Sequence, residues 1–187
     1  MAAGQLKFGR LSREKWLERA LRIVAAKGGA RLRVDTLVAA MGVTKGSFYW
    51  HFRNRDDFVH HLIQYWDDHY TRNVIEMLAG HKGDARQRLF ALMKMVYEKN
   101  LNALDIPFRS WAAQEPKVAT MVTRVDRQRL DTVRTLFREM GFKGKELETR
   151  TRAFVTFMSL EPAIFDRLSK KERMAQLKAR HAFFTRP

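Results

Sequence analysis

The feature that most constrains this chain is a helical repeat of apolar residues that continues for about five turns in its first half. The repeat consists of Phe58, Leu62, Trp66, Tyr70, Val74 and Met77. Spacings of three and four residues place these side chains on one face of a helix, whereas a half-buried strand would need strict alternation. Asn54 can cap this helix, and Asp56 and Asp57 would lie in its first turn. A single long helix is therefore predicted, long enough to leave one module and enter the next.

Shorter apolar-periodic segments surround this helix, and glycine or proline separates most of them. They cover 12–27, 34–41, 44–51, a stretch around 89–97, a short piece between Pro107 and Pro116, 118–140, 146–159 and 170–184. Ser12 can cap the first of them, and Gly28 and Gly29 end it. No strand-like alternation and no internal repeat stands out. The predicted fold class is all-α, with about nine helices.

Length and composition exclude several classes of protein. A chain of 187 residues buries one substantial core, or one small module against a larger one. Without cysteine it has no disulfides, no thiolate nucleophile and no cysteine-based zinc site. No apolar run reaches about 18 residues, and Met1 to Arg10 lacks the apolar stretch of a secretory signal. We therefore expect a cytoplasmic protein with no membrane partner.

The charge balance points to a polyanionic partner. Lysine and arginine total 36 against 20 acidic residues, which gives a formal net charge of +16. Such an excess attracts polyanions over about a Debye length, and nucleic acid is the most common of them. Charge alone does not separate DNA from RNA, a membrane surface or simple solubility.

A helix-turn-helix pattern narrows the choice to DNA. The segment Leu37 to Val43 has a short helical pattern in which Gly42 supplies the small residue that a tight turn needs. Thr44 can cap the helix that follows, and Lys45 would be its first residue. In this motif the second helix enters the major groove with its N-terminal residues.

The run from Gly42 to Arg55 reads GVTKGSFYWHFRNR and closely resembles the signature of the tetracycline-repressor (TetR) family. The turn, the Lys-Gly pair, the sequence of an aromatic residue, His and Phe that ends the second helix, and the basic residue that opens the next helix all match. The resemblance is densest from Leu17 to Asp57, and beyond Trp66 it is one of helix count and layout. It implies a helix-turn-helix DNA-binding domain at 1–57 and a helical ligand-sensing and dimerisation domain at 58–187.

The resemblance also implies DNA contacts for individual residues. Phosphate contacts are expected from Thr44, Tyr49, His51 and Arg55, and approaches to base edges from Lys45, Gly46 and Ser47. Trp50 either lies against the DNA or packs as an ordinary aromatic. Phe48 and Phe52 are expected in the core.

Two basic elements leave alternatives open. Many relatives open the second helix with Thr or Ser, where this chain has Arg33-Val34-Asp35-Thr36, so Arg33 or Thr36 is expected to replace the missing hydroxyl. Lys7, Arg10 and Arg13 either reach a minor groove as an arm or form a solvated tail.

The second domain is expected to hold a small-molecule effector, by the same resemblance. The candidate pocket residues are Tyr97, Phe108, Arg109, Trp111 and Met121, although at helical spacing such residues are commonly ordinary core. Arg109 would be costly to bury unpaired, so it either bonds a carboxylate such as that of Asp126 or faces an anionic ligand. The expected effector is anionic or apolar.

The last two helices are expected to form a homodimer as a four-helix bundle, again by the resemblance. The candidate interface residues are Phe154, Phe157, Met158, Leu177, His181 and Phe184. Pro162 should end or kink the penultimate helix. The predicted function is a dimeric regulator, a repressor rather than an activator, that binds a near-palindromic double-stranded DNA operator and responds to an effector.

Two other classes of function were weighed. A sequence-indifferent architectural DNA-binding protein needs only the charge of +16. A helical enzyme would need a catalytic group, yet no HExxH pattern, Ser-His-Asp grouping or phosphate loop is apparent. The cluster of His60, His61, Asp67, Asp68 and His69 has poor spacing for a metal and is expected to be a solvated face. We expect no metal, no cofactor and no catalytic residue.

Overall fold

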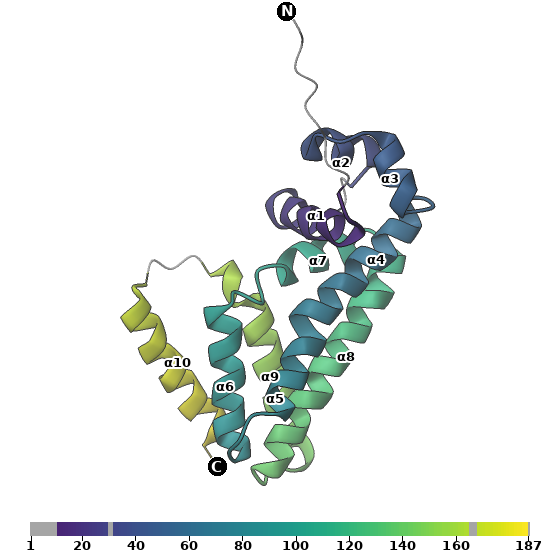
Figure 1. The fold of residues 1–187 in the computed structure, drawn as a ribbon. Coiled ribbons are helices and arrows are strands. Elements are labelled where there is room, and N and C mark those ends of the chain that lie inside the picture. Colours follow the sequence, from purple (N-terminus) through teal and green to yellow (C-terminus); the bar gives the residue numbers. More distant parts are fainter. Residues whose placement is uncertain (1–10, 30–31, 165–167, 187) are drawn as a thin grey trace, which may run out of the picture.

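The computed structural model describes residues 11–29, 32–164 and 168–186, and helices with their connecting turns account for all of its regular structure (Figure 1). The α-helices are α1 (Arg13–Lys27), α2 (Val34–Met41), α3 (Lys45–His51), α4 (Arg55–Asp67), α5 (Asn73–Ala79), α6 (Ala85–Glu98), α7 (Asp105–Ala112), α8 (Pro116–Glu139), α9 (Gly144–Leu160) and α10 (Lys170–Thr185). A π-helical segment η1 (Asp68–Arg72) and a 3-10 segment η2 (Glu161–Ala163) complete them. The all-α fold class is confirmed.

The long helix predicted from the apolar repeat is present as α4, η1 and α5, which follow one another without a break. The side chain of Asn54 caps it by accepting a hydrogen bond from the backbone N–H of Asp57 at 2.9 Å. When α4, η1 and α5 are counted as one rod and the short η2 is left out, the described residues contain nine helices. Its repeat is fully buried at Phe58 and Leu62 but 41% exposed at Met77, so the rod leaves the core at its far end.

Local signals set the ends of α1 and α9 as the sequence predicted, whereas α7 begins at Asp105, two residues before the Pro107 that was expected to precede it. Ser12 caps α1, and Gly28 ends it with a φ of 75°, a conformation that glycine adopts without steric cost. Pro162 lies in η2, directly after α9 ends at Leu160, which confirms that it stops the helix.

Two clusters of buried side chains hold the molecule together. The first joins α1 to α4 with α7 and the first half of α8, through residues such as Trp16, Phe48, Phe108 and Trp111. The second joins α6, the second half of α8, α9 and α10. In Figure 1, α1 to α3 lie at one end, and α4 and α8 run side by side away from them. The first cluster crosses the predicted domain boundary at residue 57, which stays a prediction.

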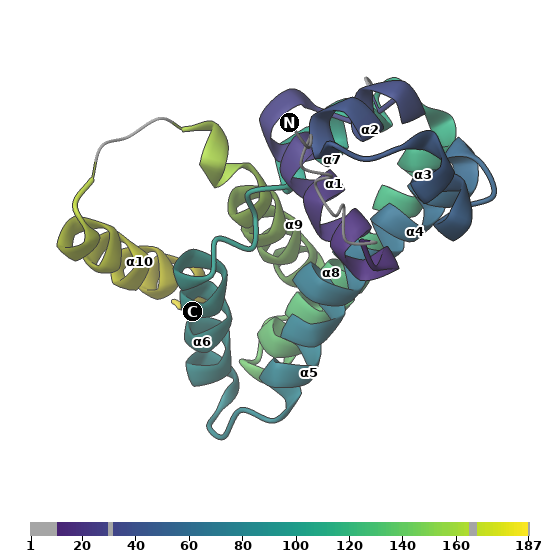
Figure 2. The same cartoon turned by 45° about the horizontal axis from the view of Figure 1, so that its top comes forward.

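Helix α10 packs against α6 at the edge of the molecule, as Figure 2 shows. Among the helices of the described ranges, none is long and apolar enough to cross a membrane.

Candidate nucleic-acid interface

The turn between α2 and α3 has the geometry of a helix-turn-helix. Gly42 adopts the left-handed conformation (φ 65°, ψ 37°), and its N–H donates to the carbonyls of Val38 and Ala39. Thr44 is extended, and its Oγ1 accepts a hydrogen bond from the N–H of Ser47 at 3.2 Å. Helix α3 therefore begins at Lys45, as predicted, with its first residues on the outside of the molecule.

One face of α3 is fixed in the core. The ring of Phe48 is fully buried, 5.7 Å from that of Trp16 on α1 and 5.5 Å from that of Phe58 on α4. Phe52 is 1% exposed. The prediction that Phe48 and Phe52 are core residues is confirmed, and their packing fixes which face of α3 points outward.

The outward face carries the residues that the sequence assigned to DNA. Tyr49 is 56% exposed and Trp50 is 67% exposed. The Nζ of Lys45 lies 2.6 Å from a carboxylate oxygen of Asp35 on α2, and this hydrogen bond raises the pKa of the lysine. Because both side chains are exposed, water and salt screen the pair, and a DNA group can replace Asp35 at little cost.

Nothing described within the chain requires glycine at position 46. A Cβ added there would meet only the Oγ1 of Thr44, at 3.7 Å, which is ordinary van der Waals contact. Its φ lies outside the left-handed region that favours glycine. A requirement for glycine at this point would have to come from a surface outside the chain.

Three of the predicted contact residues also have partners inside the chain. The Oγ of Ser47 accepts from the indole N–H of Trp16 at 3.4 Å. The Nε2 of His51 donates to the carbonyl of Leu11 at 2.7 Å. These bonds orient both side chains at the edge of the exposed face. The third residue, Arg55, makes several hydrogen bonds to other parts of the chain.

The guanidinium of Arg55 joins α4 to two distant segments. Its Nε donates to the carbonyl of Leu32 at 2.9 Å, and its terminal nitrogens donate to both carboxylate oxygens of Glu115 at 3.1 and 2.9 Å. Glu115 also accepts from the indole N–H of Trp111 at 2.9 Å. The hydrogen bond with Arg55 is the main reason that the pKa of Glu115 is lowered and that of Arg55 raised. A phosphate contact by Arg55 would compete with Glu115 for the same nitrogens.

The remaining basic candidates lie on the surface or outside the described residues. Arg33 and Thr36 are both exposed at the start of α2, and the side chain of Arg33 makes no capping hydrogen bond. The guanidinium of Arg13 lies 5.4 Å from the centroid of the Phe52 ring. Lys7 and Arg10 of the predicted arm lie outside the described residues.

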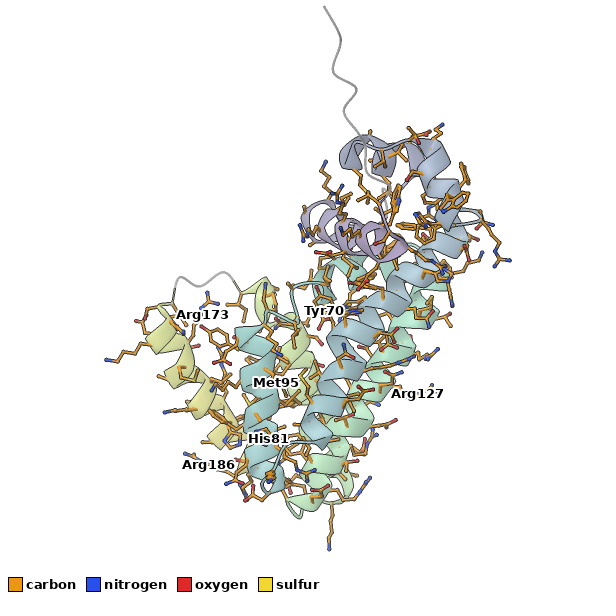
Figure 3. All side chains as sticks on the ribbon, in the orientation of Figure 1. Tyr70, His81, Met95, Arg127, Arg173 and Arg186 are labelled. Carbon is orange, nitrogen blue, oxygen red and sulfur yellow. The ribbon has the colours of Figure 1, made fainter. Side chains whose placement is uncertain are left out.

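A cavity of about 80 Å³ lies below this module, between η1, α5, α6, α7, α8 and α9. Tyr70, which lines it, is labelled near the middle of the molecule in Figure 3. Most of its lining is apolar, and a polar corner is formed by Asp105 at the start of α7 and Arg129 on α8. Arg129 donates to Asp105 Oδ2 at 2.7 Å and to Thr71 Oγ1 at 3.1 Å.

Residues 17–62 match the family model described as bacterial regulatory proteins, tetR family. The chain carries the N-terminal module of the TetR family. The match covers α2, the turn and α3, most of α1 and the first part of α4, which are the elements that build the exposed face.

A curated relative and two solved structures extend the likeness beyond residues 17–62. Over 85 residues it is 35% identical to the transcriptional regulator AcuR of Cereibacter sphaeroides, an alignment that spans 44% of this chain and only 39% of that relative. A Rhodococcus sp. protein assigned to the TetR family has the same fold (TM-score 0.69, 17% identity, 93% of this chain and 99% of that one). A TetR-family transcriptional regulator from Marinobacter aquaeolei VT8 does too (TM-score 0.67, 13% identity, 94% and 89%). All three are described as transcriptional regulators.

The five predicted pocket residues do not line the cavity. Phe108 and Trp111 are fully buried in the first core cluster, where Phe108 stacks on Trp66 at 4.3 Å, and Met121 packs against the same cluster. Tyr97 lines a separate groove beside α10. Phe108 and Trp111 are therefore ordinary core residues, which was the second possibility considered for them.

Arg109 pairs inside the chain, which was the first of its two predicted alternatives. Its terminal nitrogens donate to the two carboxylate oxygens of Asp126 at 2.8 and 2.6 Å, and this bond raises the pKa of Arg109. The sequence missed the residues that do form the polar corner, Asp105 and Arg129, because their apolar neighbours come from several helices far apart in the chain.

The residues predicted for the dimer interface pack largely within one copy. Phe154, Leu177 and Phe184 are buried in the second core cluster, and the rings of Phe154 and Phe184 are 5.2 Å apart. The Nε2 of His181 donates to the carbonyl of Arg86 on α6 at 2.9 Å. Phe157 and Met158 are half-buried against the same cluster. These side chains hold α10 on α6 and α9, and the exposed faces of α9 and α10 carry other residues.

The His and Asp residues considered as metal ligands do not form a cluster. His61 and His69 each donate Nδ1 to the backbone carbonyl four residues earlier in the same rod, at 2.7 and 3.0 Å. Over the described parts of the chain, no group of three or more His, Cys, Asp or Glu residues is placed to hold a metal ion.

Proposed function

We propose that this chain is a ligand-responsive transcription regulator, a repressor that binds a near-palindromic DNA operator as a dimer and is released by a small effector. The observation that carries the proposal is the face of α3. Phe48 and Phe52 hold this helix against α1 and α4, and the tight turn at Gly42 leaves Lys45, Gly46 and Tyr49 exposed on a TetR-family module. A short helix presented in this way fits the major groove.

The proposed contacts divide by chemistry. The ammonium of Lys45 reaches guanine acceptors, and Gly46 and Ser47 let the helix backbone approach the bases. Thr44, Tyr49 and His51 donate to phosphates, with Arg33 and Thr36 at the start of α2 and Trp50 against the sugar-phosphate backbone. The net charge of +16 supports the phosphate contacts and a strong dependence of affinity on salt.

The proposed regulation passes through α7, which touches both parts of the molecule. Asp105 at its N-terminus lines the cavity, and Trp111 near its C-terminus donates to Glu115, which holds Arg55 on α4. A Cβ at Gly29, just after α1, would overlap the Trp111 ring, so this contact is tight. An effector in the cavity that moves α7 would change how the 1–57 domain sits on the 58–187 domain, and with it the spacing of two DNA-binding heads.

The proposed dimer uses the outward faces of α9 and α10. Three large apolar side chains are exposed there or just after α9: Leu160 (42%), Ile164 (64%) and Phe183 (71%). A second copy that covers these residues would remove them from water and place two heads about one helical turn, ~34 Å, apart.

Selection of genomic DNA by the purified full chain, followed by sequencing, tests the proposed function. We expect enrichment of one near-palindromic motif with half-sites about 10 base pairs apart. The charge of +16 also suits an architectural protein that binds any duplex. Bound fragments without a shared motif would contradict the regulator and support that alternative.

A further inference from the structure

The imidazole of His51 is held in one orientation by the segment that leads into α1. Its Nε2 lies 2.7 Å from the carbonyl oxygen of Leu11, two residues before that helix begins. Leu11 is 8% exposed, and Ser12 caps α1 directly after it, so the core and the helix start fix the position of this carbonyl. A carbonyl oxygen only accepts hydrogen bonds. Nε2 of His51 therefore carries a proton whether the ring is neutral or charged.

The other ring nitrogen, Nδ1, is the one whose chemistry changes with protonation. A neutral imidazole carries one proton, so Nδ1 presents a lone pair while Nε2 donates to Leu11. Nδ1 has no hydrogen-bond partner among the described residues, and it is accessible to water, unlike the buried polar atoms that lack a partner. At the surface, the neutral ring of His51 therefore offers an acceptor, and only the doubly protonated ring offers a donor.

This edge of α3 suits a DNA phosphate. His51 follows Ser47 by one helical turn, and both bond to the start of α1, since the Oγ of Ser47 accepts from the indole N–H of Trp16. The N-terminus of α1 carries the partial positive charge of a helix dipole, which favours an anion. A phosphate of the DNA backbone is an anion that only accepts hydrogen bonds, so the lone pair of a neutral His51 ring would repel it.

The nearest charged and titratable groups on the packed elements belong to α1 and α4. The guanidinium of Arg13 on α1 lies 5.4 Å from the ring of Phe52, and that ring lies 6.1 Å from the ring of His51. On α4, the ring of His61 lies 6.2 Å from the ring of Phe52, and its Nδ1 is 3.5 Å from Asp57. The cation of Arg13 disfavours a further positive charge nearby.

The carboxylates around α3 have other partners. Asp57 accepts hydrogen bonds from the backbone and the guanidinium of Arg53, and Asp35 on α2 pairs with Lys45 at the opposite end of α3. Among the residues that the structure describes, no carboxylate forms an ion pair with His51. The free chain therefore provides no carboxylate to stabilise a second proton on this ring, whereas a DNA phosphate beside Nδ1 would stabilise it.

We infer that His51 binds a DNA phosphate as an imidazolium ion, so that each chain takes up about one proton from the solvent when it binds a duplex. Nε2 keeps its bond to Leu11, and the new proton on Nδ1 donates to a phosphate oxygen. Imidazole groups titrate between about pH 5 and pH 8. Because the bound state holds one more proton than the free state, DNA affinity rises as the pH falls through this range. This inference rests on the proposed function, in which His51 contacts a phosphate.

Calorimetry on the wild-type chain counts the protons directly. A duplex of about 20 base pairs, long enough for two half-sites, is titrated with the full chain near pH 7.5 in buffers that differ in their heat of ionisation. The dependence of the binding heat on the buffer gives the number of protons exchanged. We expect an uptake of up to about one proton per chain, and no uptake would overturn the inference.

Nuclear magnetic resonance of the full chain with ¹⁵N-labelled histidine shows which ring nitrogen gains the proton. In the free chain near pH 7.5, the ring of His51 should be neutral and protonated at Nε2. In the duplex complex, both ring nitrogens should carry a proton. A ring that stays neutral in the complex would mean that Nε2 leaves Leu11 for the phosphate or that His51 does not contact DNA, and either result would overturn the inference.

His51→Gln removes the titrating group and keeps an N–H for the carbonyl of Leu11. Between pH 8 and pH 6.5, the duplex affinity of the wild type should rise about tenfold more than that of the variant. His69→Gln is the matched control, because His69 is exposed on η1 and bonds only to the carbonyl of Tyr65 among the described residues. It should keep the wild-type pH dependence. The same pH dependence in His51→Gln and wild type would overturn the inference, and calorimetry on the wild type decides the question if the variant does not fold.

A phosphate contact does not depend on base sequence, so each measurement is made with the selected operator and, at low salt, with an unrelated duplex. Proton uptake on every duplex without preference for any motif would contradict the proposed regulator and support the inference. Preference for the operator without proton uptake would support the regulator and overturn the inference. Failure of one is therefore distinguished from failure of the other.

Discussion

At the scale of single residues, α3 keeps structure and recognition on opposite faces. Phe48 and Phe52 hold the helix in place, whereas Gly46 and Tyr49 contribute little buried surface. Substitutions on the exposed face should therefore change DNA binding without changing stability, because few contacts inside the chain are lost.

Gly46→Ala tests whether an outside surface requires the glycine. The added Cβ has room within the chain, and alanine favours a helix over glycine by up to about 1 kcal/mol. The melting temperature should stay the same or rise, while operator affinity falls about tenfold because the methyl group occupies the space nearest the bases. Thermal unfolding and operator titration measure the two effects, and unchanged affinity would exclude close approach at this position.

Lys45→Ala and Tyr49→Phe separate reading of bases from binding of phosphates. Loss of the lysine should weaken operator binding by about 1–3 kcal/mol and relax the choice of sequence, because a base contact is removed. Loss of the tyrosine hydroxyl should weaken binding to all duplexes alike. Titrations with operator and with unrelated duplex compare the two variants. An operator affinity within twofold of wild type for Lys45→Ala would show that another helix reads the bases.

What the sequence predicted at this scale was local. The caps at Ser12, Thr44 and Asn54 and the buried Phe48 and Phe52 follow from neighbours within one or two turns, and all are present. The bond between Arg55 and Glu115 joins residues 60 positions apart, and no local pattern indicates it.

At the scale of elements, α7 and the start of α8 form the junction between the DNA-binding module and the cavity. Trp111 and Glu115 are one helical turn apart in sequence and bond to each other, and Glu115 opens α8. The two elements therefore respond together when α7 moves. This role as a junction follows from where α7 and the start of α8 lie, between the DNA-binding module and the cavity, and not from their amino-acid composition.

Glu115→Gln tests the junction through stability. The bidentate bond to Arg55 loses its charge, and because both side chains are partly exposed the free energy of unfolding should fall by only about 1 kcal/mol at pH 7. The pKa of Glu115 in the folded chain is below its ordinary value, so its stabilising effect is full above that value and is lost as pH falls through the lowered pKa. Denaturant unfolding of wild type and variant should therefore converge below about pH 4. A gap that stays constant with pH would contradict the ion pair.

The same variant tests whether Glu115 competes with DNA for Arg55. Freed from the carboxylate, Arg55 should bind phosphate more readily, and operator affinity should rise severalfold. Glu148→Gln is the matched control, because Glu148 makes a similar two-point bond to Arg134 far from the DNA-binding module. It should leave operator affinity unchanged. A loss of affinity in Glu115→Gln alone would assign Arg55 a purely structural role.

At the scale of the whole molecule, the sequence predicted the helices but not which surface covers each one. The apolar face of α10, with Leu177 and Phe184, was predicted to meet a second copy, yet α6 and α9 of the same chain cover it. An amphipathic pattern specifies that a face is buried and not what buries it. The same limit applied to Phe108 and Trp111, which are buried by the core rather than by a ligand.

Phe183→Glu tests the proposed dimer at a residue that the chain itself leaves 71% exposed. A charge at a buried interface should raise the dimer dissociation constant at least about a hundredfold, whereas the stability of a single copy should hardly change. Analytical ultracentrifugation over a range of concentrations measures this shift. Lys178→Gln, on an exposed position of the same helix, lowers the net charge by the same single unit and serves as the control. An unchanged dimer would place the interface elsewhere.

Competition between the selected operator and unrelated duplex, at physiological salt and with the mass of the complex recorded, is the most direct test of a dimer that reads sequence through α3. Two chains should occupy one duplex and prefer the operator on the order of 10³-fold or more. A single chain on each duplex, or equal affinity for both duplexes, would contradict it.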